Sequence, residues 1–337
     1  MNFRPVFIAG CDRSGTTLLG DLLGTSRWSI VTPESQFMHD LVIRLGLKSF
    51  DNAFQAAIWL QEHFRFAAWG MPMSPQELAE LIDLHDPRST IENLVSRYAR
   101  INHPDKQSAD IWIDHTPDNF KYQTMLKRLF PEARFIHIVR DGRAVCASIK
   151  SLEWGPNNAY MASRHWATRL QEALAVEIAE DGNCLRVRFE DLLEMPEKEI
   201  MRICQFIDLP YETALLEGGG LHLPAFTKNQ HRLVGRSIDP SRAASWQRKL
   251  STSEIRDFES YPLTHTLLNR LGYKTLSQSP PSLSRCHVLK CYVHDFFRYM
   301  LNRSKHKRME MKAILANKHR MPALMARVAD NPFNQAK

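Results

Sequence analysis

Short apolar runs recur along the first two thirds of the chain and are separated by longer segments. Runs of this kind predict buried β-strands. The five runs are Val6–Ala9, Trp28–Thr32, Ile111–Ile113, Phe135–Val139 and Cys184–Phe189. Because helical patterns separate them, we expect parallel strands joined by helices. The sequence therefore predicts an α/β fold: a parallel sheet of four or five strands, flanked by helices on both faces.

Apolar residues at three- and four-residue spacing predict the helices. The predicted helices are Thr16–Leu23, Ala53–Phe66, Gln76–Leu84, Ser89–Ile101, Ala159–Ala179 and Pro196–Ile207. Three of them lie between the second and third strands and form a helical insertion. Large apolar side chains gather near its prolines, at Phe64, Phe66, Trp69, Met71 and Met73. We expect them to pack in the core; the alternative is a wall of a substrate site.

A glycine turn joins the first strand to the first helix. Gly10 and Gly15 have the spacing of the two glycines of a P-loop, and the N–H groups at a helix start bind anions. The next residues are Thr16 and Thr17, where a nucleotide triphosphatase has lysine and then serine or threonine. Arg13 supplies positive charge from inside the loop instead. The residues expected to bind phosphate are Arg13, Ser14, Gly15, Thr16 and Thr17.

A second candidate phosphate motif follows the fourth strand. Arg140 stands at the strand end, Gly142 permits the turn into a helix, and Ser148 follows about two helical turns later. An arginine and a hydroxyl on adjoining element ends can contact one phosphate group. Arg143, by contrast, is expected to pack or pair locally.

The two motifs together resemble those of sulfotransferases that use 3′-phosphoadenosine 5′-phosphosulfate (PAPS). The first, Arg13-Ser-Gly-Thr-Thr-Leu-Leu19, is closest to the tyrosylprotein and bacterial branches, and the resemblance covers residues 3 to 275. It implies PAPS as donor, 3′-phosphoadenosine 5′-phosphate (PAP) as product, and no metal. It also implies that the first motif holds the 5′-phosphosulfate, while Arg140 and Ser148 hold the 3′-phosphate.

The resemblance further implies two catalytic positions besides Arg13. Glu34, in Thr32-Pro-Glu-Ser-Gln36, stands where the family has its catalytic base. The alternative is a first-turn glutamate that favours a helix dipole. His115 stands where the family often has a lysine that stabilises the transferring group. A histidine would supply that charge only if protonated, and the alternative is that it packs or caps at the strand end.

The resemblance also assigns residues to the nucleotide. Phe189 replaces a tyrosine that contacts the adenine, which keeps a stacking face and loses the hydroxyl. Arg236 and Ser237 fall in a segment similar to the loop that covers the cofactor in the family. A mobile basic loop before a helix is the alternative for this segment.

The positive charge of the chain is concentrated in its C-terminal tail. The 337 residues carry a net charge of +7, of which residues 285–337 carry +9 and the preceding part −2. Apolar pairs recur every four residues from Val288/Leu289 to Met300/Leu301, which indicates one apolar helical face. We expect a pair of helices packed on the catalytic part. Contact of residues 285–328 with an anionic membrane surface is the alternative, and no motif indicates nucleic-acid binding.

The cysteines and the N-terminal residues predict the cellular compartment of the protein. Six cysteines without Cys-x-x-Cys spacing predict free thiols in a reducing compartment. The chain starts at the first strand, with no basic n-region before it and no apolar stretch of ~18 residues. We therefore expect a bacterial, cytoplasmic protein, with attachment to the inner membrane face as the alternative.

These observations predict a sulfotransferase domain over residues 1–275, a linker over 276–284 and a basic helical extension over 285–337. The expected reaction is metal-free, in-line transfer of the sulfuryl group of PAPS to a hydroxyl or amine. The sequence leaves the acceptor open between a sugar, a lipid, a peptide and a small metabolite, and it does not give the oligomeric state. Two rival functions remain: a Mg-ATP-dependent small-molecule kinase, and a silent nucleotide-binding protein that docks on a membrane or partner.

Overall fold

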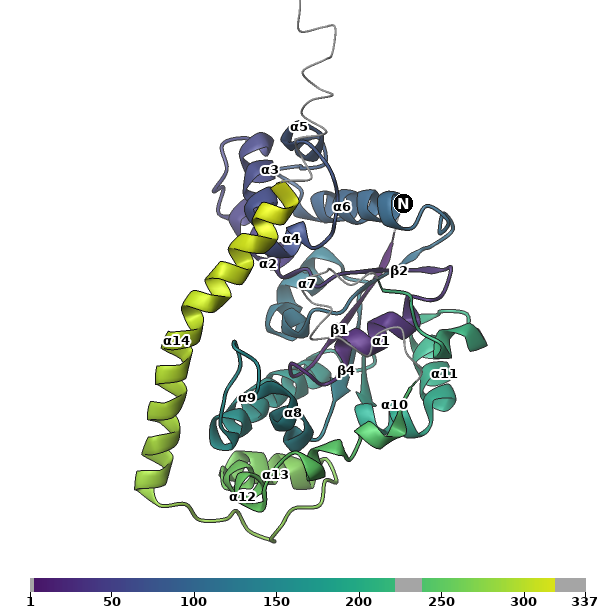
Figure 1. Cartoon of the computed structure of the whole chain (residues 1–337). Helices are drawn as coiled ribbons and strands as arrows, with labels where there is room; N and C mark the ends of the chain where they lie inside the picture. Colours follow the sequence, from purple (N-terminus) through teal and green to yellow (C-terminus); the bar gives the residue numbers. More distant parts are fainter. Residues whose placement is uncertain (1–2, 222–237, 319–337) are drawn as a thin grey trace, which may run out of the picture.

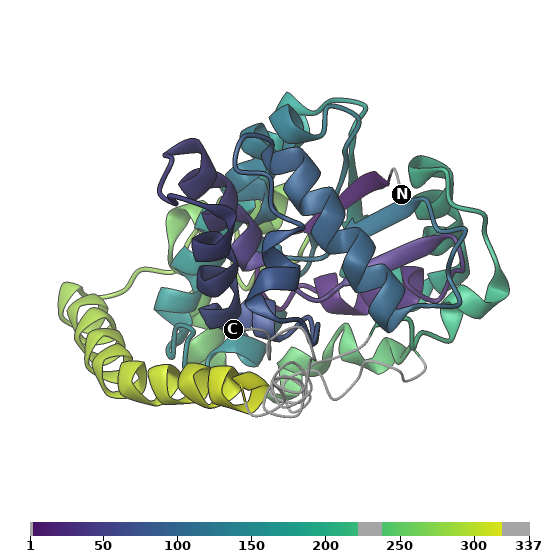
Figure 2. The same ribbon diagram turned by 90° about the horizontal axis from the view of Figure 1, so that it is seen from above.

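A five-stranded parallel sheet forms the centre of the computed structural model (Figures 1 and 2). The structure describes residues 3–221 and 238–318, with side chains up to Asn302. The strands are β1 (Arg4–Ala9), β2 (Ser29–Thr32), β3 (Ile111–Asp114), β4 (Arg134–Val139) and β5 (Cys184–Arg188). Their order is β2-β3-β1-β4-β5, and each neighbouring pair is parallel. The predicted fold class is confirmed.

Alternation along β1 sends side chains to two separate cores. Val6 and Ile8 join a core with α1 (Thr16–Leu23), α10 (Phe189–Glu194) and α11 (Pro196–Ile207). Phe7 and Ala9 point to the opposite face, because successive side chains of a strand alternate. The helices on that face include α2 (Gln36–Gly46), α6 (Pro87–Asn102), α7 (Gln123–Leu129) and α9 (Ala159–Ala179). The expectation of helices on both faces is therefore confirmed.

The insertion after α2 continues with α3 (Ala53–Glu62), α4 (Phe64–Ala67) and α5 (Pro75–Ala79). The helix predicted to reach Phe66 is interrupted at His63, whose backbone is extended. Core packing is confirmed for four of the five large apolar side chains, and only Phe64 is half-buried. The four buried ones are Phe66, Trp69, Met71 and Met73. Their burial favours core packing over a substrate-site wall.

A third core lies under the C-terminal part of the domain, between α8 (Gly142–Ile149), α9, α12 (Thr252–Glu259) and α13 (Pro262–Arg270). Short 3₁₀ helices complete the domain. They are η1 (Pro117–Tyr122), η2 (Thr213–Leu216), η3 (Pro240–Arg242) and η4 (Ser245–Arg248).

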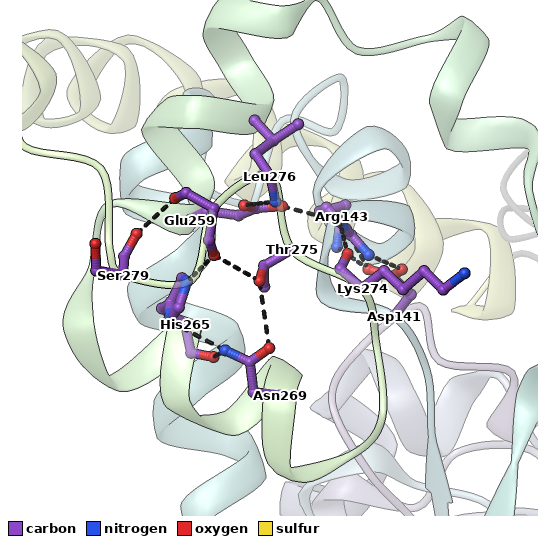
Figure 3. A network of polar contacts seen from close by, with 10 residues as sticks. Asp141, Arg143, Glu259, His265, Asn269, Lys274, Thr275, Leu276 and Ser279 are labelled. Carbon is purple, nitrogen blue, oxygen red and sulfur yellow. Dashed lines mark hydrogen bonds and ion pairs between the residues drawn. The ribbon is translucent and has the colours of Figure 1, made fainter.

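A buried arginine joins α8 to this C-terminal part (Figure 3). Arg143 pairs with Asp141 at 2.7 Å, as the expected local pairing requires. It also pairs with Glu259 of α12 at 2.8 Å and donates to the backbone oxygen of Lys274 at 2.7 Å. The other oxygen of Glu259 accepts the N–H of Leu276 at 2.7 Å. One guanidinium thus fixes the segment that follows α13 to the start of α8.

The described part of the tail forms a single helix, α14 (Arg285–Lys318), which runs along one side of the molecule from the level of α12 to that of α4 (Figure 1). The predicted pair of helices is therefore wrong. The segment contains neither glycine nor proline, and the basic run Arg303–Arg308 does not interrupt a helix. Among the described helices, none has the length and apolar character needed to cross a bilayer.

The Arg143 network yields a stability prediction. Glu259→Gln should lower the free energy of unfolding by about 3 kcal/mol, the lower end for breaking a buried ion pair, because Asp141 still faces Arg143. Denaturation in urea measures the change. The matched control is Glu92→Gln, which removes a partly exposed pair with Arg88 and should cost less than about 1 kcal/mol. Equal losses for the two variants would contradict the role given to Glu259.

Candidate functional site

The expected site residues each follow a different strand. All five strands are parallel, so their carboxyl ends meet at one edge of the sheet. Arg13 follows β1, Glu34 follows β2, His115 follows β3, Arg140 follows β4 and Phe189 follows β5. The sheet therefore brings together residues that are up to 176 positions apart in the sequence.

The loop after β1 leaves the start of α1 open to an anion. Arg13 has φ 69° and Gly15 has φ 112°, and the N–H of Ser14 donates to Cys11 O at 3.0 Å. Gly15 is the N-cap of α1, and no side chain caps this end. A Cβ at Gly15 would stand 2.5 Å from the ring of Phe189, so only glycine fits. The predicted anion loop therefore has the required backbone.

The residues of both phosphate motifs form one cluster. Arg13 Nε donates to Ser148 Oγ at 3.2 Å, and an Arg140 guanidinium nitrogen donates to the backbone oxygen of Arg13 at 3.0 Å. The Arg140 guanidinium lies 4.1 Å from the ring centre of Phe189. The sequence placed Arg13 and Ser148 at different phosphates, whereas the structure joins their side chains directly.

Two buried polar atoms of this cluster have no hydrogen-bond partner among the described residues. They are Ser14 Oγ and Arg140 Nε. Burial lowers the pKa of Arg140 to about 10, more than Glu190 opposes, so its guanidinium is still charged at neutral pH. Because buried polar atoms are normally hydrogen-bonded, these two atoms fit an anionic ligand.

Glu34 lies ahead of α2 rather than in its first turn. α2 begins at Gln36, and its first turn contains no acidic residue, so the helix-dipole alternative is wrong. The next residue, Ser35, is held by the turn after β3: its N–H donates to Thr116 Oγ1 at 2.8 Å and its hydroxyl donates to Asp114. Asp114 also accepts from the N–H of Thr116 at 2.8 Å. The polar network at the end of β3 thus positions Glu34.

The insertion supplies a cation that the sequence analysis missed. Arg65 of α4 pairs with Glu34 at 3.0 Å and donates to Gln36 Oε1 at 2.7 Å. On the other side of Glu34, the indole N–H of Trp69 donates to Pro33 O at 3.1 Å. No motif marks Arg65, which is 31 residues from Glu34 and joins it only through the fold.

His115 is buried beside α1. Its side chain is only 2% exposed, and neither ring nitrogen has a hydrogen-bond partner among the described residues. Burial lowers its pKa by more than the charges of Glu34 and Asp114 raise it. Burial thus disfavours the positive charge that the family's lysine would supply.

Asp12 fixes the loop to α9, a contact that the sequence analysis also missed. Its carboxylate lies 3.2 Å from His165 Nε2 and 3.8 Å from Arg169 Nε. Burial raises the pKa of Asp12, but the hydrogen bond from His165 and the charge of Arg169 hold it below the ordinary value. Arg169 also pairs with Asp118 at 2.6 Å.

Arg236 and Ser237 lie outside the described residues. The chain before them is attached to α1, because Asp21 accepts the N–H groups of Gly219 and Leu221, each at 3.0 Å.

A group of metal-binding residue types lies away from these elements. Asp257 of α12 and His287 and Cys291 of α14 have ligand atoms within 4.8 Å of one another. Neither helix contributes a residue to the cluster at the strand ends.

Comparison with known proteins supports this assembly of motifs. Residues 5–213 match the model of the sulfotransferase family. The chain is 24% identical over 294 residues to protein-tyrosine sulfotransferase A of Caenorhabditis elegans, a match that covers 83% of this chain and 70% of that protein. It is 26% identical over 191 residues to protein-tyrosine sulfotransferase 1 of Danio rerio, covering 53% of this chain and 52% of that protein. The chain thus spans about half the length of the zebrafish relative.

The fold is also shared with solved structures. The sulfotransferase domain of the curacin biosynthetic pathway superposes with a TM-score of 0.53 at 20% identity, covering 82% of this chain and 99% of that domain. The sulfotransferase domain of the Synechococcus PCC 7002 olefin synthase gives a TM-score of 0.52 at 23% identity, covering 81% of this chain and 96% of that domain. Because the family match spans more than half of the chain and includes both phosphate motifs, the protein belongs to the sulfotransferase family.

Proposed function

We propose that the protein transfers the sulfuryl group of PAPS to a hydroxyl group of its acceptor. The observation that carries the proposal is the convergence of Arg13, Arg140 and Ser148 beside the uncapped start of α1. Two guanidinium groups, a hydroxyl and the N–H groups of a helix start suit a donor with two separate phosphate groups. The two buried atoms without partners, Ser14 Oγ and Arg140 Nε, fit the same ligand.

The proposal divides the donor between the two motifs. PAPS would supply the sulfuryl group and the phosphate leaving group. Arg13 and the first N–H groups of α1, with Thr16 and Thr17, bind the 5′ side and stabilise the charge that develops on the leaving oxygen. Arg140 and Ser148 bind the 3′-phosphate, and Phe189 contacts the adenine. The transfer uses no metal ion in this proposal, because these groups already supply positive charge.

Glu34 acts as the base in this proposal. It takes the proton of the acceptor hydroxyl, whose oxygen forms a bond to sulfur while the bond from sulfur to the leaving phosphate oxygen breaks. Arg65, at 3.0 Å, and the network around Ser35 hold the Glu34 carboxylate in place. The names of the two animal relatives make a tyrosine hydroxyl the first acceptor to test.

The first prediction from this proposal concerns donor binding. PAP should raise the melting temperature, because a ligand that binds the folded state stabilises it. Arg140→Ala should weaken PAP binding by roughly 10- to 100-fold, the value of a hydrogen bond to a charged group, and should affect adenosine 5′-phosphate much less. Titration calorimetry with both nucleotides measures this, with Arg100→Ala on the exposed side of α6 as control. Equal losses for both nucleotides would refute the assignment of Arg140 to the 3′-phosphate.

The second prediction concerns the base. Glu34→Gln should keep PAP affinity and lose turnover by ~10²–10⁴, the usual contribution of a positioned base. Glu80→Gln, an exposed change in the same insertion, is the control. Near-normal turnover of Glu34→Gln would make another residue the base, with His115 the first to test. EDTA should leave the rate unchanged; inhibition by EDTA together with ATP-dependent product formation would favour a kinase.

The third prediction concerns pH. Burial lowers the pKa of His115 below its ordinary value, so this side chain is uncharged throughout the range above pH ~6.5. The ratio of the rate of the wild-type protein to that of His115→Gln should therefore stay constant as pH rises through ~6.5. A wild-type rate that falls through this range, with no such fall in His115→Gln, would show that His115 acts as a cation.

A further inference from the structure

The side of α14 that faces the domain is mostly polar, with Val288 half-buried and Tyr292 beside Tyr160. Its buried or half-buried positions include Cys291, Asp295, Arg298 and Asn302, and the helix contacts α9 and α4. The contacts near its start are also polar. His287 Nε2 lies 2.9 Å from Asp257, the N–H of Asn157 donates to Asp295 at 3.1 Å, and Asn158 Nδ2 donates to Cys291 O at 2.9 Å.

The opposite side of α14 is apolar and exposed, and is called here the outer face. It consists of Leu289, Val293, Phe296, Phe297, Met300 and Leu301. Phe296 is 60% exposed and Phe297 is 62% exposed. This arrangement is the reverse of a surface helix, which buries its apolar side. The expectation that the apolar face packs on the domain is therefore wrong, and a contiguous patch of this kind marks an interaction surface.

The charge beside the outer face indicates the kind of surface that it complements. Lys290 and Arg285 are exposed on the same stretch of helix, and the run Arg303–Arg308 continues α14 with four more lysines and arginines. Residues 285–337 carry +9 in total. Such a helix is complemented by a negatively charged surface with an apolar interior beneath it. An anionic lipid bilayer has both properties.

A second copy of this chain fits the outer face less well. Pairing two α14 helices would bring two strongly basic segments together, which costs energy through like-charge repulsion. The outer face is also wide, because adjacent residues are apolar at 296/297 and again at 300/301. A helix–helix seam uses a narrower stripe.

We propose that the outer face of α14 docks the protein on anionic lipid, with the helix lying in the plane of the membrane surface. The two phenylalanines enter the boundary between headgroups and acyl chains, and the basic residues contact the headgroups. The proposal does not depend on sulfuryl transfer.

Sedimentation of the full-length protein with lipid vesicles tests the proposal. The protein should bind vesicles of an equimolar mixture of phosphatidylcholine and phosphatidylserine, bind vesicles of phosphatidylcholine alone much more weakly, and lose binding at high salt. The double variant F296S/F297S should have an affinity for the anionic vesicles at least roughly tenfold lower, because two aromatic side chains are no longer transferred from water into the lipid. Both residues are exposed, so the variant should keep the PAP-induced rise in melting temperature.

A matched control makes the same type of change elsewhere. The variant I178S/M201S replaces exposed apolar side chains on α9 and α11 and should bind vesicles like the wild type. Absence of binding to the anionic vesicles would overturn the proposal, as would unchanged binding by F296S/F297S. A concentration-dependent dimer in sedimentation velocity that F296S/F297S abolishes, without vesicle binding, would show instead that a second copy covers the outer face.

Discussion

The parallel pairing of β1 with β3 on one side and β4 on the other is the constraint on which the rest of the structure depends. Parallel strands need crossover connections, and these place helices on both faces of the sheet. They also bring every carboxyl end to the same edge, where the chain turns into loops that carry Arg13, His115 and Arg140. The site is thus a consequence of strand direction, because no two of these residues are neighbours in sequence.

Buried polar contacts hold the loops at that edge in place. Asp114 ties the segment of Glu34 to the end of β3, and Asp12 ties the first loop to α9. Each tie uses a carboxylate whose hydrogen bonds are satisfied by neighbours, which offsets the cost of burying charge. The cluster of Arg13, Arg140 and Ser148 contains two buried polar atoms without partners among the described residues, Ser14 Oγ and Arg140 Nε. Because these two atoms lie beside the uncapped start of α1, a bound anion would supply the partners that they lack.

Local pattern was enough to predict much of this fold. The helices over Ala159–Ala179 and Pro196–Ile207 have the predicted ends, since apolar spacing and caps are encoded within the segment itself. The two phosphate motifs were likewise recognisable, because each consists of a strand end, a turn and a helix start. The nearness of Arg65 to Glu34 could not be predicted, since it depends on how the insertion folds back over β2.

The orientation of α14 is another feature that local sequence pattern could not predict. Periodicity identified the apolar face of α14 correctly, but periodicity does not say whether a face turns toward the domain or away from it. The polar contacts of His287 and Asp295 decide the orientation, and each depends on a partner more than twenty residues away. The environment of His115 was similarly hidden: burial lowers the pKa of this side chain, and no local pattern reveals that burial.

The central place of β1 has a consequence for how the chain is made. Of the five strands, β1 is synthesised first, yet its two neighbours begin at Ile111 and Arg134. At a synthesis rate of roughly 5–20 residues per second, several seconds pass between the synthesis of β1 and that of either neighbouring strand. Throughout that interval its apolar side chains, Val6 to Ala9, have no sheet to join. The nascent chain therefore contains an unpaired apolar strand, and until β3 is made the helices that follow β1 are the elements available to cover it.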